Sequence, residues 1–245
     1  PAPVDFVRHD ADAVFERPVF IVGSPRSGST LLFETLSQAP GVYTIGDESH
    51  EVIEGIAALG AEAHGYESNR LLPADATPEV AQQLRDRFVA ALRDRNGQSP
   101  PAGARLRLLE KTPKNSLRVP FLASVFPEAR FIYLHRDPRQ VLSSMMEAWS
   151  SGRFRTYPRL PGWTGLPWSL LLVPGWRDLI GHSLHTIVAH QWSTMTRLLL
   201  DDLEQLPADR WTVARYDALV AQPQAEIRRL CDAVGYEWDR TLAEL

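Results

Sequence analysis

The sequence predicts an α/β protein in which a P-loop-like central parallel sheet is flanked by helices. Short apolar segments alternate with longer segments of helical periodicity, and this alternation is typical of parallel sheets that are covered on both faces. The first apolar segment runs directly into a Gly- and Ser-rich turn, as in phosphate-binding proteins. A chain of 245 residues is long enough for one large domain, and we predict that residues 1–245 form a single domain.

The stretch Arg17–Leu36 carries most of this prediction. Its apolar part, Val19–Val22, is expected to be a buried strand, and a helix is expected to begin near Ser29. Backbone N–H groups and the positive end of the helix dipole converge in the turn between them, which is how such turns bind anions. The segment Gly23–Thr30 (GSPRSGST) matches the phosphate-binding loop except at Ser29, which stands where that loop has Lys.

The missing Lys makes an ATPase or a kinase a weaker interpretation, because that side chain supplies the point charge that reaches a β/γ-phosphate pair. Arg26, at the crest of the loop, instead offers a planar cation suited to a terminal phosphate. A P-loop nucleotide kinase or related phosphotransferase is the first alternative. A non-catalytic module that keeps a nucleotide-binding fold is the second, and a purely structural turn is the third.

The rest of the chain continues the alternation of strands and helices. The segment Tyr43–His50 is expected to be a loop that leads into a helix, and Thr77 and Asp137 are expected N-caps. The other expected elements are a helix from Pro78 to Asn96, a strand Arg105–Leu109, a helix Asn115–Phe126, a strand Ala129–His135, a helix from Pro138, a helix Leu184–Leu206, a strand Trp211–Arg215 and a helix Pro223–Val234.

Residues 157–180 depart from this pattern. Tyr157–Trp176 contains three of the seven Trp and is dense in Pro and Gly. Such a density of Pro does not allow a long helix, and the aromatic content does not suit a solvated linker. We expect an ordered, irregular loop or lid whose apolar side chains serve either as core or as a binding surface.

Composition restricts the possible partners and location. The net charge of −4 gives no reason to expect nucleic acid or an anionic membrane as a partner. The single cysteine, Cys231, fits a buried apolar position in a reducing compartment, and we expect a cytoplasmic protein. The longest apolar run, Leu166–Val173, is too short to span a bilayer. Because the chain starts at Pro1 without a Met, we expect a piece of a larger protein.

Four motifs together resemble the PAPS-dependent sulfotransferases. The similarity is to the bacterial branch related to tyrosylprotein sulfotransferases and to sulfotransferase domains of polyketide pathways, and it covers about Val19 to Gly235. It implies that the donor is 3′-phosphoadenosine 5′-phosphosulfate (PAPS) and the product adenosine 3′,5′-bisphosphate (PAP). The motifs are FIVGSPRSGST (Phe20–Thr30), LEKTP (Leu109–Pro113), RFIYLHRDPRQVLSS (Arg130–Ser144) and WTVARYDALVAQP (Trp211–Pro223).

The resemblance also implies which residues bind the donor. Arg136 and Ser144, eight residues apart, would hold the 3′-phosphate, and Tyr216 would lie near the adenine. Helical geometry is compatible with this, because Ser144 lies on the second turn after the cap and can share an anion with Arg136. The residues that would cradle the 5′-phosphosulfate are Arg26, Ser27, Gly28, Ser29 and Thr30.

Sulfuryl transfer is similar to phosphoryl transfer, with in-line attack and charge that must be stabilised on the departing oxygens. Lys111 matches a family lysine that faces the bridging oxygen of the donor. The acceptor hydroxyl needs a general base. Glu48 is the first candidate, His50 the second and His190 the third. We expect no metal, because one sulfate and one phosphate carry less charge than a triphosphate.

The implied acceptor is a hydroxyl on a small organic molecule or on a chain bound to a carrier protein. The Trp-rich segment 157–180 is expected on the acceptor side, which favours an apolar acceptor. Many family members have a late Gly-rich segment with basic residues that also contacts the 3′-phosphate. After Tyr236 this sequence contains only EWDRTLAEL. Either the chain is truncated, or another cation, such as Lys114 or Arg139, replaces the segment.

Overall fold

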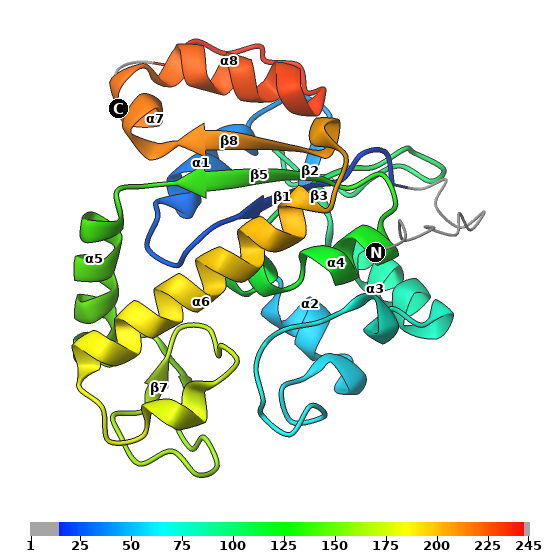
Figure 1. Cartoon of the computed structure of the whole chain (residues 1–245). Helices are drawn as coiled ribbons and strands as arrows, with labels where there is room; N and C mark the ends of the chain where they lie inside the picture. Colours follow the sequence, from blue (N-terminus) through cyan, green and yellow to red (C-terminus); the bar gives the residue numbers. More distant parts are fainter. Residues whose placement is uncertain (1–14, 243–245) are drawn as a thin grey trace.

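A computed structural model describes residues 15–242 of the chain. Six strands form the central sheet, and its order is β3-β2-β4-β1-β5-β8 (Figure 1). Neighbouring strands are parallel except at one edge, where β3 is antiparallel to β2. The predicted α/β class with a central, mostly parallel sheet is therefore confirmed. The strands are β1 (Val19–Val22), β2 (Val42–Thr44), β3 (Arg93–Asp94), β4 (Arg107–Lys111), β5 (Arg130–His135) and β8 (Trp211–Arg215).

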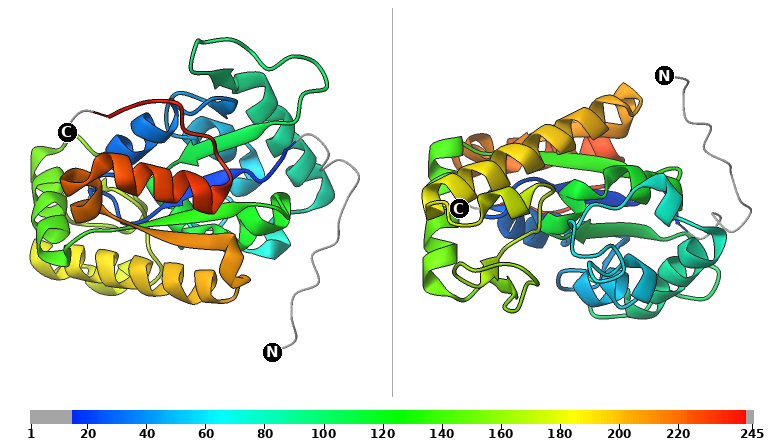
Figure 2. Two further views of the ribbon diagram at one scale, coloured as in Figure 1. Left: turned by 90° about the horizontal axis from the view of Figure 1, so that it is seen from above. Right: turned by 60° about the horizontal axis from the view of Figure 1, so that its bottom comes forward.

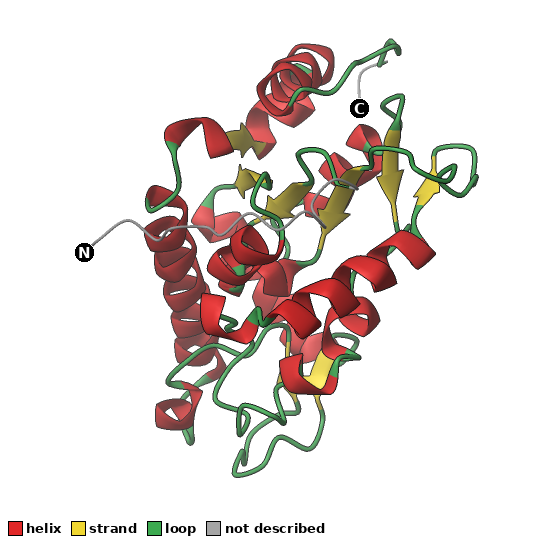
Figure 3. Cartoon of the chain, turned by 90° about the vertical axis from the view of Figure 1, so that its right-hand side faces the viewer, coloured by secondary structure: helices red, strands yellow, loops and turns green. Residues whose placement is uncertain are grey.

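Helices cover both faces of the sheet, so that the strands form a layer between them (Figure 3). Along β1, Val19 and Ile21 pack into one apolar cluster, whereas Phe20 and Val22 pack into the other. This alternation is the two-residue period of a strand that is buried on both faces. The first cluster includes α1 (Ser29–Leu36), α7 (Tyr216–Ala221) and α8 (Pro223–Val234), and the second includes α2 (His50–Glu54), α3 (Pro78–Ala91), α4 (Val119–Val125), α5 (Pro138–Ser151) and α6 (Leu184–Glu204).

The strand register places three sequence motifs at one edge of the sheet. Ile21 of β1 is level with Lys111 of β4, and Val22 is level with Tyr133 of β5. Because these strands are parallel, the loops that follow them emerge together at their carboxyl ends, where ligands bind in sheets of this type. The Gly/Ser loop, the LEKTP motif and the turn at Arg136 therefore become neighbours.

The structure corrects the predicted elements around the edge of the sheet. Val42–Thr44, of which Tyr43 and Thr44 were expected in a loop, is strand β2, and the helix that begins at Pro78 ends at Ala91 instead of Asn96. Leu92 is already extended, and Arg93–Asp94 pair with β2. Strands of two or three residues are too short to show a hydrophobic period, so only the pairing of β2 with β4 and of β3 with β2 reveals them.

The LEKTP region differs as well. Strand β4 spans Arg107–Lys111 and not Arg105–Leu109, so Lys111 lies on a strand and not in a loop. The expected helix Asn115–Phe126 is a 3₁₀ turn (Pro113–Leu117) followed by α4, and Arg118 between them is not helical. Sequence patterns place strands by their apolar residues, and here the last two strand positions are charged.

The segment 157–180 is ordered, as expected, but its tryptophans belong to the core. Strands β6 (Arg155–Tyr157) and β7 (Trp168–Ser169) form a small antiparallel sheet below α5 and α6 (Figure 2, right). Trp168 and Trp176 are fully buried and pack edge-to-face with each other, and Trp149 of α5 packs on Trp168. These rings hold the segment against the main domain.

Two further sequence predictions concern the core and the bilayer. Cys231 is buried in α8, and burial raises the pKa of its thiol to about 12, so this side chain is an inert apolar group as predicted. Among the described helices, none combines the length and apolar content needed to cross a bilayer.

Candidate active site

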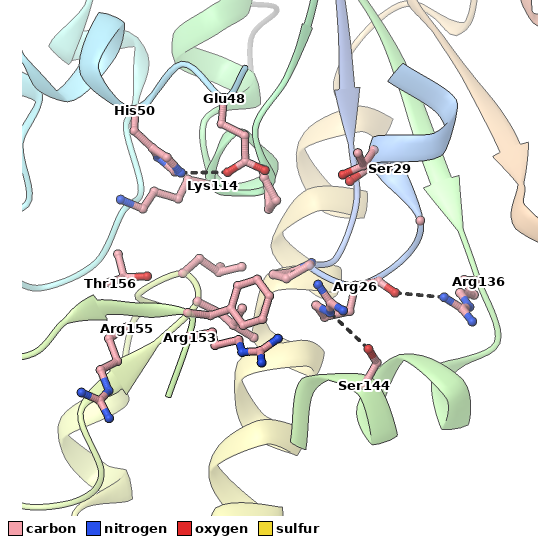
Figure 4. A pocket seen from close by; sticks show the side chains of 17 residues that line it. Arg26, Ser29, Glu48, His50, Lys114, Arg136, Ser144, Arg153, Arg155 and Thr156 are labelled. Atoms are coloured by element: carbon pink, nitrogen blue, oxygen red, sulfur yellow. Dashed lines mark hydrogen bonds and ion pairs between the residues drawn. The ribbon is translucent and has the colours of Figure 1, made fainter. Parts of the chain in front are cut away.

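A cavity of about 590 Å³ opens at the carboxyl edge of the sheet (Figure 4). This volume lies within the range of roughly 300–1,000 Å³ that is common for small-molecule sites. Its walls are formed by the loop after β1, by Glu48 and the start of α2, by Pro113 and Lys114, by Arg136 and Ser144, and by the segment Arg153–Thr156 together with Leu170 and Leu171. Segments far apart in sequence thus converge on one cavity.

The two turns expected to bind anions contact each other directly. Arg26 Nε donates a hydrogen bond to Ser144 Oγ at 3.1 Å, and Arg136 Nη1 donates to the backbone oxygen of Arg26 at 3.2 Å (Figure 4). All three residues line the cavity. The loop after β1 and the turn after β5 therefore belong to one site.

The loop after β1 has its shape because two glycines accept close neighbours. At Gly23, a Cβ would lie 2.8 Å from the backbone oxygen of Leu134, and the Gly23 N–H donates to Ser116 Oγ at 2.8 Å. Gly28 has φ +96° and its Cα faces the ring of Tyr216, where a Cβ would lie 2.4 Å from a ring carbon. The loop is held against β5 at one end and against α7 at the other.

Gly28→Ala is expected to destabilise the protein by more than the roughly 1–2 kcal/mol that a left-handed conformation costs a residue with a Cβ. The additional loss comes from the overlap with Tyr216. Urea unfolding measures it. Gly41→Ala is the matched control, because Gly41 also has positive φ (+71°) but open space around its Cβ position. Equal destabilisation of both variants would contradict the close approach of Tyr216.

The structure separates the five residues expected to cradle the phosphosulfate. Arg26, Gly28, Ser29 and Thr30 line the cavity. Ser27 is fully buried beneath the loop, and its Oγ has no hydrogen-bond partner among the described residues.

Glu48 connects both of the other catalytic candidates. Its Oε1 accepts a hydrogen bond from Lys111 Nζ at 2.6 Å, and its Oε2 lies 2.9 Å from His50 Nε2 (Figure 4). Burial raises the pKa of Glu48, but the hydrogen bonds and charges of His50 and Lys111 outweigh it and lower the pKa to about 2. Glu48 is therefore ionised at neutral pH. Lys111 also lies 3.5 Å from Thr30 Oγ1, next to the anion loop.

The depressed pKa of Glu48 makes a prediction about acid stability. Its ionised form is favoured in the folded state, so its contribution to folding is present above pH 4.5, the ordinary pKa of a glutamate, and is lost as the pH falls towards about 2. Glu48→Gln is expected to flatten the fall of the unfolding free energy between these pH values. Urea unfolding at stepped pH measures this, with Glu51→Gln, an exposed position on α2, as the control. An unchanged slope in Glu48→Gln would contradict the ion pair.

The chain has two lysines, Lys111 and Lys114. Lys114 lines the cavity, whereas Lys111 is buried and reaches the site through its contacts with Glu48 and Thr30. Lys114 Nζ donates to both carboxylate oxygens of Glu54 at 2.8 Å, and it lies beside His50, across the cavity from Arg136 (Figure 4). Arg139 is 90% exposed and paired with Asp137. Lys114 is thus separated from Arg136 by the cavity, and Arg139 is among the lining residues of neither cavity that contains Arg136.

Tyr216 lies on the far side of Arg136. The Arg136 guanidinium stands 4.1 Å over the Tyr216 ring, a cation–π contact. A second cavity of about 350 Å³ contains both residues, and Arg136 thus lines both cavities. The donor-binding candidates form a continuous surface from the first loop to Tyr216.

His190 is not part of the site. It lies on α6, where its Nε2 is 3.2 Å from Thr194 Oγ1. Within residues 15–242, no group of three or more His, Cys, Asp or Glu side chains is arranged to hold a metal ion.

Sequence reasoning missed Glu110 and the segment Arg153–Thr156. Glu110 was placed in a loop, although a glutamate directly after Leu108 and Leu109 continues an apolar strand and could have indicated a buried carboxylate. Nothing in the sequence of Arg153–Thr156 marks it as a cavity wall.

A mostly parallel sheet with a Gly/Ser loop after its central strand and a basic turn after the neighbouring strand defines an α/β protein with two groups of anion-compatible donors at one edge of the sheet. The family model described as "Sulfotransferase family" matches residues 18–240. The chain belongs to this family.

Individual relatives agree with this assignment. The chain is similar to protein-tyrosine sulfotransferase A of Caenorhabditis elegans, with 26% identity over 90% of this chain and 50% of the relative. It is also 26% identical to nodulation protein NoeE of Sinorhizobium fredii, over 89% of this chain and 50% of the relative. The chain thus spans about half the length of these relatives. Among solved structures, the sulfotransferase domain from the curacin biosynthetic pathway shares the fold, with a TM-score of 0.51 at 17% identity over 91% of this chain and 75% of that one.

Proposed function

We propose that the chain is a single sulfotransferase domain that moves a sulfuryl group from PAPS to the hydroxyl of an organic acceptor. The observation that carries the proposal is the direct bonding of two anion-binding turns, Arg26 to Ser144 and Arg136 to Arg26, in one cavity. A donor with phosphosulfate at one end and phosphate at the other suits two such turns better than a mononucleotide does. Membership of the Sulfotransferase family supports the same activity.

The proposed donor fits the groups on this surface. The 5′-phosphosulfate would lie on the backbone N–H groups of the first loop, at the N-terminus of α1. The Ser27 hydroxyl is buried and has no hydrogen-bond partner among the described residues. An anion in the loop would provide an acceptor near this hydroxyl. Arg136 and Ser144 would bind the 3′-phosphate, and Tyr216 would lie beside the adenine in the second cavity.

The chemistry needs a proton acceptor and a cation. The acceptor oxygen forms a bond to sulfur as its proton leaves and as the bond between sulfur and the phosphate oxygen breaks, which gives a sulfate ester and PAP. Glu48 is the proposed base, with His50 beside it as the second candidate. Lys111 would stabilise the charge on the leaving phosphate oxygen. If Lys111 turns from Glu48 to that oxygen, one group that lowers the pKa of Glu48 is withdrawn and the carboxylate becomes a stronger base.

The apolar residues that line the cavity indicate the kind of acceptor. Phe154, Leu170 and Leu171 line the cavity together with Glu48 and His50. These apolar walls support an acceptor with an apolar part, either a small molecule or a chain on a carrier protein. A cytoplasmic location stays a prediction from the single cysteine.

Incubation of the protein with PAPS and a panel of phenols, aliphatic alcohols and carrier-bound hydroxyacyl chains tests the function. Mass spectrometry should detect a gain of one sulfuryl group on an acceptor, and calorimetry should show PAP binding. PAP binding without product from any panel member would favour the non-catalytic module instead. Magnesium-dependent turnover of ATP would favour the phosphotransferase, which the missing loop Lys does not support.

A further inference from the structure

A carboxylate lies buried directly beneath the loop that carries Glu48 and His50. Glu110, on β4, is 0% exposed. Its Oε1 accepts hydrogen bonds from Ser49 Oγ at 2.7 Å and from Thr112 Oγ1, and its Oε2 accepts from Asn115 Nδ2 at 2.7 Å. Glu110 is not among the residues that line the cavity, and the proposed reaction assigns it no role.

One backbone group fixes the direction of one bond in this network. The Ser49 N–H donates to Thr112 Oγ1 at 2.7 Å, and a backbone N–H can only donate. The Thr112 hydroxyl accepts that bond and gives its own proton to Glu110 Oε1. The Ser49 hydroxyl and the Asn115 amide also donate to Glu110, so three side-chain donors converge on one carboxylate.

Three consecutive residues at the end of β4 bind two consecutive residues, Glu48 and Ser49. Lys111 binds Glu48, while Glu110 and Thr112, on either side of Lys111, bind Ser49. The helix that follows, α2, is only five residues long. Such a short helix orders few residues by itself, and the network beneath Ser49 adds both main-chain and side-chain bonds.

We propose that Glu110 is a positioning residue, which acts through Ser49 and Thr112 to hold the backbone between Glu48 and His50 so that both side chains face the cavity. The inference rests on the proposed function, in which Glu48 receives the proton of the acceptor. Burial of a carboxylate is costly for stability even when it is hydrogen-bonded. An apolar side chain at the position of Glu110 would avoid this cost in stability, but it could not accept the three hydrogen bonds.

Thr112→Val and Thr112→Ser form a matched pair of variants. Val keeps the shape but removes the hydroxyl that links Ser49 to Glu110, whereas Ser keeps that hydroxyl. Thr112→Val is expected to lower kcat by about 10- to 100-fold, since small misplacements of catalytic groups have effects of this size. Thr112→Ser is expected to retain kcat, and both variants are expected to bind PAP with unchanged affinity. Glu110→Gln places an amide N–H₂, which can only donate, next to one of these donors. This variant is expected to lower kcat as much as Thr112→Val does.

A double-mutant cycle separates positioning from general damage. In a Glu48→Gln background, Thr112→Val is expected to add little further loss, because its effect passes through Glu48. Losses that multiply in the double variant, or equal losses in the Val and Ser variants, would overturn the proposal.

Amide hydrogen exchange tests positioning without any activity. Thr112→Val is expected to speed exchange in a peptide covering residues 41–56, while Thr112→Ser leaves it unchanged and peptides of α8 keep their protection in both. If the wild type transfers no sulfuryl group, the proposed function fails while this result still supports the network. Unchanged exchange at 41–56 in Thr112→Val would overturn the positioning role even in an active enzyme.

Discussion

Replacement of Lys111 by Met is expected to lower kcat by about 10²- to 10³-fold, the range found when one group that stabilises a developing anion is removed. Lys111 is buried, and its ammonium lies between Glu48 (2.6 Å) and the hydroxyl of Thr30 in the anion loop (3.5 Å). Met fills a similar volume but carries no charge. Steady-state kinetics with PAPS and the acceptor found in the panel give kcat, and calorimetry gives the PAP affinity.

Two controls separate chemistry from folding in this experiment. Arg105→Met removes an exposed cation just before the same strand and is expected to leave kcat within the error of the measurement. Lys111→Arg keeps the charge in a planar, larger group and is expected to recover only part of the rate. PAP lacks the sulfuryl group, so its affinity should change much less than kcat. A kcat for Lys111→Met close to that of the wild type would contradict the assigned role.

Arg136→Ala is expected to weaken PAP binding by about tenfold to a hundredfold, because a hydrogen bond to a charged group contributes about 1.5–3 kcal/mol. Arg136 also donates to the backbone of Arg26 and stacks on Tyr216, so its loss loosens the loop that it joins. Isothermal calorimetry with PAP measures the affinity, and the effect is expected to shrink at high salt.

Arg139→Ala is the matched control for Arg136→Ala. Like Arg136→Ala, it removes one positive charge, in this case from the first turn of α5. The Arg139 side chain, however, is 90% exposed and paired with Asp137. PAP affinity is expected to stay within about twofold of the wild type, as for exposed ion pairs in general. A larger loss in Arg139→Ala than in Arg136→Ala would mean that the 3′-phosphate lies elsewhere.

Local patterns in the sequence were sufficient for the centre of the fold. Val19–Val22, Trp211–Arg215 and Pro223–Val234 have the predicted bounds, and Asp137 caps α5 as expected. These elements are marked by strong local signals: a run of β-branched and aromatic residues, a helix cap, a Gly at a helix end. The Gly/Ser loop could be interpreted in the same way, because its backbone geometry depends on glycines close in sequence.

Short edge strands and charged strand ends could not be predicted in this way. Val42–Thr44 and Arg93–Asp94 are strands only because each has a partner across the sheet. Strand β4 extends through Glu110 and Lys111 because both charged side chains have partners there. Glu110 accepts hydrogen bonds from hydroxyl and amide groups beneath the loop, and Lys111 donates to Glu48 at the edge of the sheet. Propensity scales describe a residue by itself, whereas these positions also depend on Ser49 and Glu48, which are more than 60 residues away, or on the pairing of strands.

By itself, the sequence determined the α/β class, the family resemblance and about half of the residues that line the cavity, among them those of the Gly/Ser loop. Only the tertiary structure decided that Glu48 is ionised between Lys111 and His50, that Ser27 is buried beneath the loop, and that Glu110 lies under Ser49. The physical reason is that charge states and hydrogen-bond directions depend on burial and on neighbours from other strands, and those neighbours meet only when the parallel strands align their ends.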